Sequence, residues 1–160
     1  METFSVERAC YFAGFLDGDG SILAQIIRRK DYVNLFQIRV SITFVQKMKR
    51  IHFLRTFQSE IGVGTVRDRN DGVAELEIVG HTNVYAFLKQ IVPFLRIKRK
   101  QANLVIRICE QFHLTKENPY KFLELCDLAD QVAQLNDSKT RIFSREIVEK
   151  VLIDSGKIKK

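Results

Sequence analysis

The sequence predicts an α+β fold with an αββαββ core followed by C-terminal helices. Two regions alternate apolar and polar residues as half-buried strands do, and each follows a segment with apolar residues at helical spacing. The second half of the chain repeats apolar residues at intervals of three and four. Strand pairs that alternate with single helices and then give way to helices are typical of an α+β domain. The two strand pairs resemble a weak internal repeat.

Length and composition predict a single domain over residues 1–160. Of the 160 residues, 46% are hydrophobic and 28% charged, so the chain can bury one core. No apolar run approaches the length of a membrane span, and no cationic stretch leads into an apolar one at the N-terminus. We therefore expect no membrane partner and no targeting peptide.

The cysteines and histidines do not have the spacing of a metal site. The three cysteines lie in apolar periodic segments without a CxxC pair, so we expect reduced thiols in the core. They are Cys10, Cys109 and Cys126. The three histidines are scattered, which argues against a zinc site. We expect no small-molecule cofactor.

The first helix is predicted after Ser5, a good N-cap residue, because residues 7–16 carry apolar side chains at helical spacing. With the glycines and aspartates that follow, this motif helix covers about residues 7–19. Residues 22–27 and 37–44 form the first strand pair, and the alternation in the second strand is nearly strict. One face of this pair is therefore core and the other is polar.

A second helix and a second strand pair follow. Residues 47–61 have helical spacing, and Gly62 is placed to end the helix. Alternating residues then flank Asn70-Asp71-Gly72, which is a good hairpin turn.

Four further helices are predicted, of which the last three form a C-terminal extension over about residues 98–160. Pro119 is well placed in a first helical turn. The predicted ranges are 82–90, 98–112, 119–135 and 144–152.

The most informative stretch is Phe12–Gly20, where an apolar helix ends on two carboxylates interleaved with glycines. Aspartate near a helix C-terminus opposes the helix dipole, and a helical Gly18 loses backbone entropy. A divalent cation held by Asp19 would offset the first penalty, and close approach of a second backbone at Gly14 and Gly18 would justify the second. The alternative is an ordinary buried helix followed by a Gly-Asp turn.

The polar faces of the predicted strands mix arginine, glutamine and carboxylate side chains. Arginine pairs with guanine, glutamine with adenine, and carboxylates accept from the cytosine amino group, so this mixture suits reading in the major groove. The net charge of +7 also favours a polyanionic partner. The alternative is a solvated sheet face with cross-strand ion pairs. The residues are Gln25, Arg29, Gln37, Arg39, Ser41, Thr43, Thr65, Arg67, Arg69, Glu75 and Glu77.

Two basic clusters lie at predicted helix starts, where the helix dipole disfavours cations. They are Lys47, Lys49 and Arg50, and Lys98, Arg99 and Lys100. A phosphate would explain both, because it interacts with a helix N-terminus and nearby cations together. Solvated basic turns are the alternative. The loop 136–141 is a third candidate for backbone contacts, with a polar interhelical turn as its alternative.

The stretch Phe12–Gly20 resembles the LAGLIDADG signature of homing endonucleases, with apolar or small residues at the replaced positions. The resemblance continues in Glu60–Gly64, in Pro93–Leu95 with Lys98, and in Leu135–Thr140, so it covers nearly the whole chain. These segments are similar to the single-motif, homodimeric group that is typical of chloroplast introns. The resemblance implies that family's fold, an antiparallel DNA-binding sheet, and an organelle location in the chloroplast, with the mitochondrion as the alternative.

The resemblance also implies an active site. Asp19 would bind catalytic Mg²⁺ or a substitute divalent cation, one carboxylate from each of two subunits, with assistance from the Gly18 carbonyl. Gln46, Arg50 and Lys98 match positions that line the active site and organise water or stabilise charge. Clustered divalent ions activate water and stabilise the leaving oxygen of a phosphodiester, so no histidine base is required.

Two surfaces are implied as well. The homodimer would form through the motif helix, at Phe12, Ala13, Gly14, Leu16 and Asp17. Double-stranded DNA would contact the strand residues named above together with Ile27, Tyr32, Ser138, Lys139 and Thr140. Ile27 offers no hydrogen bond and a basic run follows at 28–30, which leaves the target sequence open.

We therefore predict a metal-dependent endonuclease that hydrolyses DNA phosphodiesters and makes a staggered double-strand break at a long pseudo-palindromic site. Two alternatives stay open. One is an intron RNA maturase of the same fold, and the other is a non-catalytic DNA-binding regulator in which Asp19 only ends a helix. The joint presence of Asp19, Gln46, Arg50 and Lys98 favours the nuclease.

Overall fold

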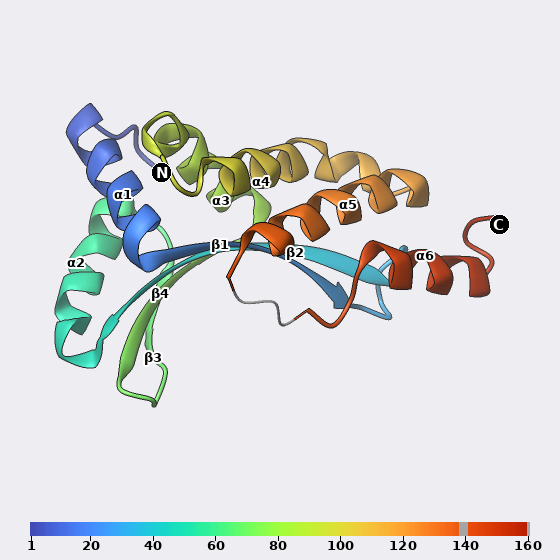
Figure 1. Ribbon diagram of the computed structural model, residues 1–160, viewed down its shortest axis with the longest axis horizontal. Helices are drawn as coiled ribbons and strands as arrows, with labels where there is room; N and C mark the ends of the chain where they lie inside the picture. The colour runs from blue at the N-terminus through green and yellow to red at the C-terminus, as the bar shows by residue number, and fades with distance from the viewer. Residues whose placement is uncertain (138–140, 160) are drawn as a thin grey trace.

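The computed structural model describes residues 1–137 and 141–159 and has an α+β architecture (Figure 1). The strands form one antiparallel sheet in the order β1 (Gly20–Arg28), β2 (Phe36–Lys47), β4 (Val73–Val79) and β3 (Thr65–Asp68). The α-helices are α1 (Val6–Asp19), α2 (Ile51–Ile61), α3 (His81–Ile91), α4 (Arg99–Gln111), α5 (Pro119–Leu135) and α6 (Arg145–Asp154). Short 3₁₀ helices are η1 (Met48–Arg50), η2 (Val92–Phe94) and η3 (Phe112–Thr115). The predicted αββαββ order with C-terminal helices is confirmed.

Most predicted boundaries hold because local signals set them. The Ser5 side chain accepts the N–H of Arg8 and begins α1, and Gly62 ends α2 with a φ of 84°. The predicted helix 47–61 starts later than expected. Lys47 stays in β2 because it pairs with Val73, and three residues of η1 then precede the α-helix.

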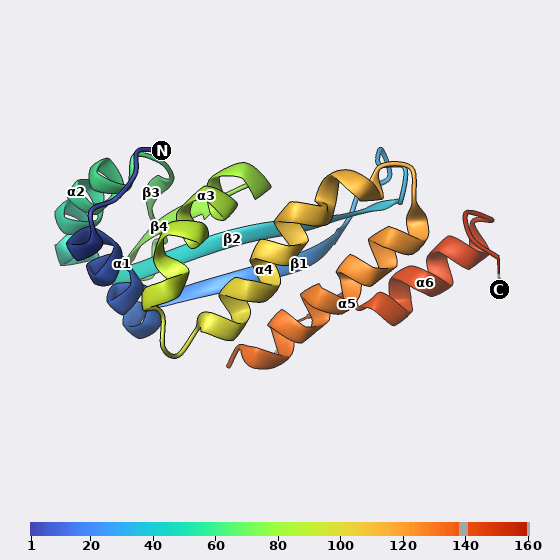
Figure 2. The same ribbon diagram turned by 90° about the horizontal axis from the view of Figure 1, so that it is seen from above.

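The helices cover one face of the sheet (Figure 1). Helices α4 and α5 lie side by side along it, while α1 and α2 lie at one end and α6 at the other (Figure 2). Apolar side chains of β1, β2 and β4 at alternate positions are buried toward the helices. The other face carries none of the helices that the structure describes, so no helix covers the polar side chains there. No described helix is both long and apolar enough to cross a membrane.

An aromatic cluster fixes α1 to the end of the sheet. Phe12 of α1, Phe44 of β2, Phe57 of α2 and Phe87 of α3 are each at most 1% exposed. The Phe57 ring lies 5.0 Å from both Phe12 and Phe44, edge to face in each case. Edge-to-face contacts add stability beyond the buried area. The middle of α1 is therefore packed, through Phe57 of α2, against Phe44 of β2.

The Phe57→Ala variant is expected to lose about 3–5 kcal/mol of unfolding free energy, because a buried ring is replaced by a cavity. For a chain of this size that corresponds to a fall in Tm of roughly 10 °C. Phe53→Ala is the matched control on the same helix, since Phe53 is 36% exposed, and should lose less than half as much. Equal losses in thermal unfolding would contradict this core assignment.

The cysteines differ in part from the expectation. Cys126 is buried and Cys109 half-buried, and burial raises the pKa of the Cys109 thiol to about 12. Cys10, however, is exposed, because the buried face of α1 is formed by Ala9, Phe12, Ala13 and Leu16. The prediction of a core thiol at Cys10 is wrong, since Cys10 lies beside that face and not on it.

Candidate active site and nucleic-acid interface

Three of the predicted catalytic residues form a hydrogen-bonded chain at the end of α1. Asp19 is the last residue of α1 and is exposed. The Gln46 Nε2 donates to Asp19 Oδ2 at 2.7 Å, and Arg50 donates through NH1 to Gln46 Oε1 at 3.0 Å. Gln46 thus links a carboxylate to a guanidinium and fixes the orientation of both.

Gly20 brings these residues together by letting β1 start directly after α1. A Cβ at Gly20 would lie 2.5 Å from the Leu16 Cδ1 and 3.0 Å from the Leu16 Cα, so a larger residue does not fit. Gly20 pairs with Phe44, two positions before Gln46 on β2. The last glycine of the motif therefore places Asp19 at the edge of the sheet, next to Gln46.

Lys98, the fourth predicted catalytic residue, reaches the same end of α1. Its Nζ donates to the backbone carbonyl of Asp17 at 2.6 Å. The Asp17 carboxylate accepts the backbone N–H groups of Arg96, Ile97 and Lys98 at 2.8, 3.3 and 2.9 Å. The family resemblance implies a place for Asp17 at the dimer interface, but its carboxylate faces the start of α4 within its own chain, where it accepts these three N–H groups.

The surroundings of Asp17 lower its pKa from the ordinary value of 3.8. Burial is the largest single influence and acts in the opposite direction, but it is outweighed by the N–H donors of Arg96, Lys98 and Ile97 and by the charge of Lys98. The folded state therefore favours the ionised form.

A pH dependence of stability follows. A folded pKa below the unfolded one means that ionised Asp17 stabilises the fold above about pH 4, and that this contribution is lost as pH falls through the folded pKa. The unfolding free energy of Asp17→Asn is expected to lie below that of the wild type at pH 7 and to approach it at pH 3. Urea titrations across this range measure the difference, and a gap that stays constant would contradict the assignment.

The expected dimer face needs correction. Phe12, Ala13 and Leu16 are 0% exposed and pack in the core of their own protomer, because the helix turns its large apolar residues toward the sheet. Gly14 and Gly18 lie on the exposed side of α1, and a Cβ added at either would meet no heavy atom within 4 Å. The exposed side of α1 thus has two positions without a side chain, one turn apart.

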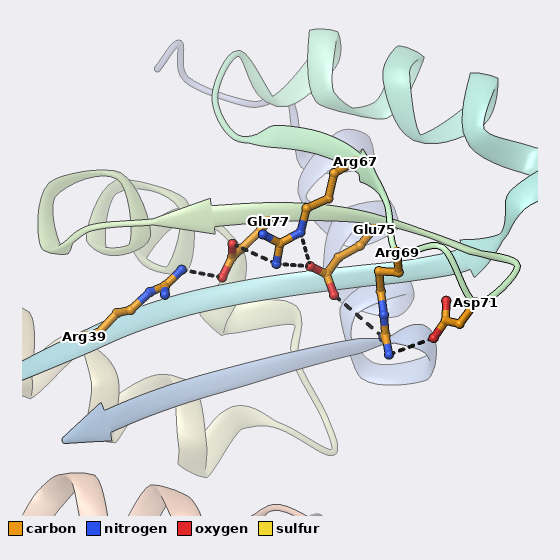
Figure 3. Close-up of polar contacts among 6 residues, drawn as sticks. All are labelled: Arg39, Arg67, Arg69, Asp71, Glu75 and Glu77. Atoms are coloured by element: carbon orange, nitrogen blue, oxygen red, sulfur yellow. Dashed lines mark hydrogen bonds and ion pairs between the residues drawn. The ribbon is translucent and has the colours of Figure 1, made fainter. Parts of the chain in front are cut away.

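The uncovered face of the sheet carries a network of ion pairs among the predicted DNA-reading residues (Figure 3). Arg39 contacts Glu77 at 2.9 Å, and Arg67 contacts Glu75 at 2.6 Å and Glu77 at 3.4 Å. Arg69 lies 3.8 Å from Glu75 and 3.1 Å from Asp71. The three arginine side chains nevertheless remain about half exposed, between 43% and 56%.

Two of the predicted DNA-reading residues are buried and not available to DNA. Glu75 is 7% exposed and both its carboxylate oxygens face arginines, so it holds Arg67 and Arg69 and is not a free acceptor for cytosine. Ser41 is 1% exposed, because its short side chain lies in register between Leu23 and Val79. A direct DNA contact from Ser41 is therefore ruled out in this arrangement.

The tip of the β1–β2 hairpin gathers another set of predicted residues. Arg29 forms an ion pair with Asp31 at 3.0 Å, donates to Gln37 at 3.4 Å and stacks on Tyr32 with 4.8 Å to the ring centroid. The hydrogen bond from Arg29 lowers the pKa of Asp31. Ile27 pairs with Gln37 in register.

The remaining predicted contacts lie on the uncovered face or outside the description. Gln25 pairs with Arg39, and Thr43 and Thr65 both pair with Glu77. Ser138, Lys139 and Thr140 lie outside the described residues.

The carboxylate at the end of α1 is a suitable ligand for a magnesium ion. Asp19 offers an exposed carboxylate oxygen, and Mg²⁺ prefers oxygen ligands while keeping several waters. The structure brings together no group of three or more histidine, cysteine, aspartate or glutamate side chains within 1–137 and 141–159 that would hold a metal. Within those residues, Asp19 is therefore the carboxylate that would hold a metal at this position.

Sequence reasoning assigned the network only in part. It placed Asp19, Gln46, Arg50 and Lys98 in one site, and the hydrogen bonds join the first three directly. It missed the role of Asp17, because only the fold brings that aspartate to the basic start of α4, about eighty residues later in the chain.

Comparisons with known proteins agree with this geometry. A family model described as LAGLIDADG endonuclease matches residues 12–98. The DNA endonuclease I-CreI of Chlamydomonas reinhardtii is 45% identical over 157 residues, which cover 98% of this chain and 96% of that protein. The DNA endonuclease I-CvuI of Chlorella vulgaris is 41% identical over 148 residues, covering 92% and 91%. A crystal structure of I-CvuI with the I-CreI target has a TM-score of 0.91 at 39% identity and covers 95% of this chain and 96% of that one. This chain therefore belongs to the LAGLIDADG endonuclease family and is a homing DNA endonuclease.

Proposed function

We propose that this endonuclease acts as a homodimer that requires magnesium and makes a staggered double-strand break at a long, pseudo-palindromic DNA site. The observation that carries the proposal is the hydrogen-bonded chain from Asp19 through Gln46 to Arg50. Lys98, at the start of α4, donates to the same end of α1. These groups lie at the edge of a sheet whose free face carries base-reading side chains.

The dimer follows from the exposed side of α1. Gly14 and Gly18 lack side chains that would keep a partner helix at the usual distance of 8–10 Å between axes. Two copies of α1 packed across a twofold axis would bring their Asp19 carboxylates together. A symmetric protein dimer reads a palindromic arrangement of half-sites.

Asp19, with the carbonyl of Gly18, is the proposed magnesium site. An ion held there would neutralise charge on the phosphodiester and favour deprotonation of an attacking water. I-CvuI has been crystallised with target DNA in the presence of magnesium, and the DNA in that structure is not cleaved. In our proposal Gln46 orients the Asp19 carboxylate, while the charges of Arg50 and Lys98 stabilise the phosphate as its negative charge grows.

The DNA would lie on the uncovered sheet face. The half-exposed guanidinium groups of Arg39, Arg67 and Arg69 suit guanine edges, and Gln25 and Gln37 suit adenine. Glu75 and Glu77 would hold the arginines in orientation. Ser138, Lys139 and Thr140 are proposed as additional backbone contacts.

The two rival functions predict different behaviour. A regulator would bind the same duplex and leave it intact, and a maturase would prefer intron RNA. The hydrogen bond between Gln46 and Asp19 favours the nuclease, because a carboxylate that only ends a helix needs no polar partner.

One domain is proposed for residues 1–160, since a single buried cluster includes residues from Ala9 to Ile158. We also propose an organelle, the chloroplast first, as its location. Two similar proteins come from green algae. If so, the DNA sequence selected from a random pool should occur in a chloroplast gene.

Selection of duplexes from a random DNA pool without magnesium tests the function directly. We expect enrichment of a pseudo-palindromic sequence and cutting of both strands when magnesium is added. Enrichment without cutting would point to the regulator or the maturase. Absence of enrichment would contradict the assignment of the sheet face.

A further inference from the structure

Helix α4 begins without a cap from its own sequence. Its N-cap residue is Lys98, no side chain nearby in sequence caps the helix, and its first turn contains no acidic residue. Free N–H groups at a helix start need an acceptor, and a negative charge there is favourable. Asp17, about eighty residues earlier in the chain, supplies the negative charge and accepts the N–H of Lys98 at the helix start, together with the N–H groups of Arg96 and Ile97 in the loop just before it.

A second hydrogen bond joins the same two residues, again with Lys98 as the donor. The Lys98 ammonium donates to the Asp17 carbonyl at 2.6 Å. Carbonyls in the last turn of a helix lack partners within the helix, and a cation is favourable there. One residue therefore holds both the backbone and the charged end of Lys98, whose flexible four-carbon side chain would otherwise sample many rotamers.

The loop before α4 is also braced from its far side. The Arg99 guanidinium donates to the carbonyls of Leu95 and Pro93 at 2.8 and 2.7 Å. The segment that carries Lys98 is thus held by the Asp17 carboxylate and by the Arg99 guanidinium. Asp19 lies two residues after Asp17, so one helical turn sets the position of Lys98 relative to the metal-binding carboxylate.

We propose that Asp17 is a positioning residue for DNA cleavage, acting through Lys98. It holds the Lys98 ammonium at the Asp19 end of the active site with two of its three N–H donors left for the phosphate or water. This proposal rests on the proposed function of Lys98. Asp17 touches neither the DNA nor the reacting atoms in this scheme.

A double-mutant cycle tests the proposal. Single-turnover cleavage of the selected duplex is measured for wild type, Asp17→Asn, Lys98→Met and the double variant, with DNA binding measured in calcium. Asp17→Asn keeps the carbonyl that accepts the Lys98 ammonium but weakens the side-chain contacts that hold the Lys98 backbone. We therefore expect it to cut about 100-fold more slowly, as for a misplaced catalytic group, with unchanged DNA affinity. In the Lys98→Met background the same change should alter the rate less than about 3-fold, since coupled residues are not additive.

Asn118→Ala is the matched control for simple loss of a helix cap. The Asn118 side chain accepts the N–H of Lys121 at 2.9 Å at the start of α5. The Asn118→Ala substitution should lower Tm by a few degrees, as Asp17→Asn should, but leave the cleavage rate unchanged.

Each other outcome has a distinct meaning. Full activity of Lys98→Met would overturn the proposed role of Lys98. If Lys98→Met cuts slowly, two results would overturn the proposal for Asp17 alone. Either Asp17→Asn cuts at the wild-type rate, or the effects of the two substitutions simply add in the double variant. If Asp17→Asn does not fold, Asp17→Glu replaces it in the cycle, because it keeps the charge and displaces the acceptor oxygens.

Discussion

The Asp19→Asn protein is expected to bind its DNA target and to leave both strands uncut. Asparagine has the same shape and keeps an oxygen that can accept from Gln46, so the fold and the hydrogen bond persist. It loses the charge that would hold magnesium. DNA affinity should stay equal or rise slightly, since one negative charge near the phosphates is removed.

The expected fall in the single-turnover cleavage rate is at least about 1000-fold, equal to about 4 kcal/mol of transition-state stabilisation. Asp154→Asn is a matched control, because Asp154 is likewise an exposed last residue of a helix, α6, at the other end of the molecule. That variant should cut normally. If Asp19→Asn unfolded instead, the structural interpretation of Asp19 as a helix end would be favoured, and normal cleavage would remove Asp19 from the site.

Local sequence signals were sufficient for most of the fold. Ser5, Gly62 and Pro119 mark helix ends through caps or backbone geometry, and strict alternation in β2 identifies which side chains face the core. These features depend on neighbours within a few residues. The predicted helix at 47–61 moved because Lys47 pairs with Val73, a distant partner that periodicity does not report.

The active site was predictable in its members and less so in its contacts. The resemblance supplied Asp19, Gln46, Arg50 and Lys98, but the bond between Lys98 and Asp17 joins segments about eighty residues apart. A pattern of residue types cannot show which carboxylate meets which helix start.

The reading surface shows the same limit. Strand alternation put Glu75 and Arg67 on one face, while the sharing of Glu75 between two arginines depends on strand register. On the motif helix, the small and apolar character of Ala13 suggested an interface, although only its position around the helix decides whether it is buried.

Gly14→Leu is expected to convert the proposed dimer to a monomer and to abolish double-strand cleavage. Gly14 lies on the exposed side of α1, where a partner helix would have to pass close to the backbone. A leucine side chain would push that helix away and separate the two Asp19 carboxylates. Sedimentation velocity measures the oligomeric state, and cleavage of the selected duplex measures activity.

This variant separates dimerisation from folding, because the two effects have opposite signs. Within the protomer an added side chain at Gly14 meets no atom within 4 Å, and leucine is a better helix former than glycine by about 0.8 kcal/mol. The isolated protomer should therefore be at least as stable as before. Ser59→Leu places the same side chain on the exposed side of α2 and should leave a dimeric, active enzyme. A Gly14→Leu protein that stays dimeric and cuts DNA would show that the two subunits meet through another surface, and the shared active site would then have to be rebuilt from different residues.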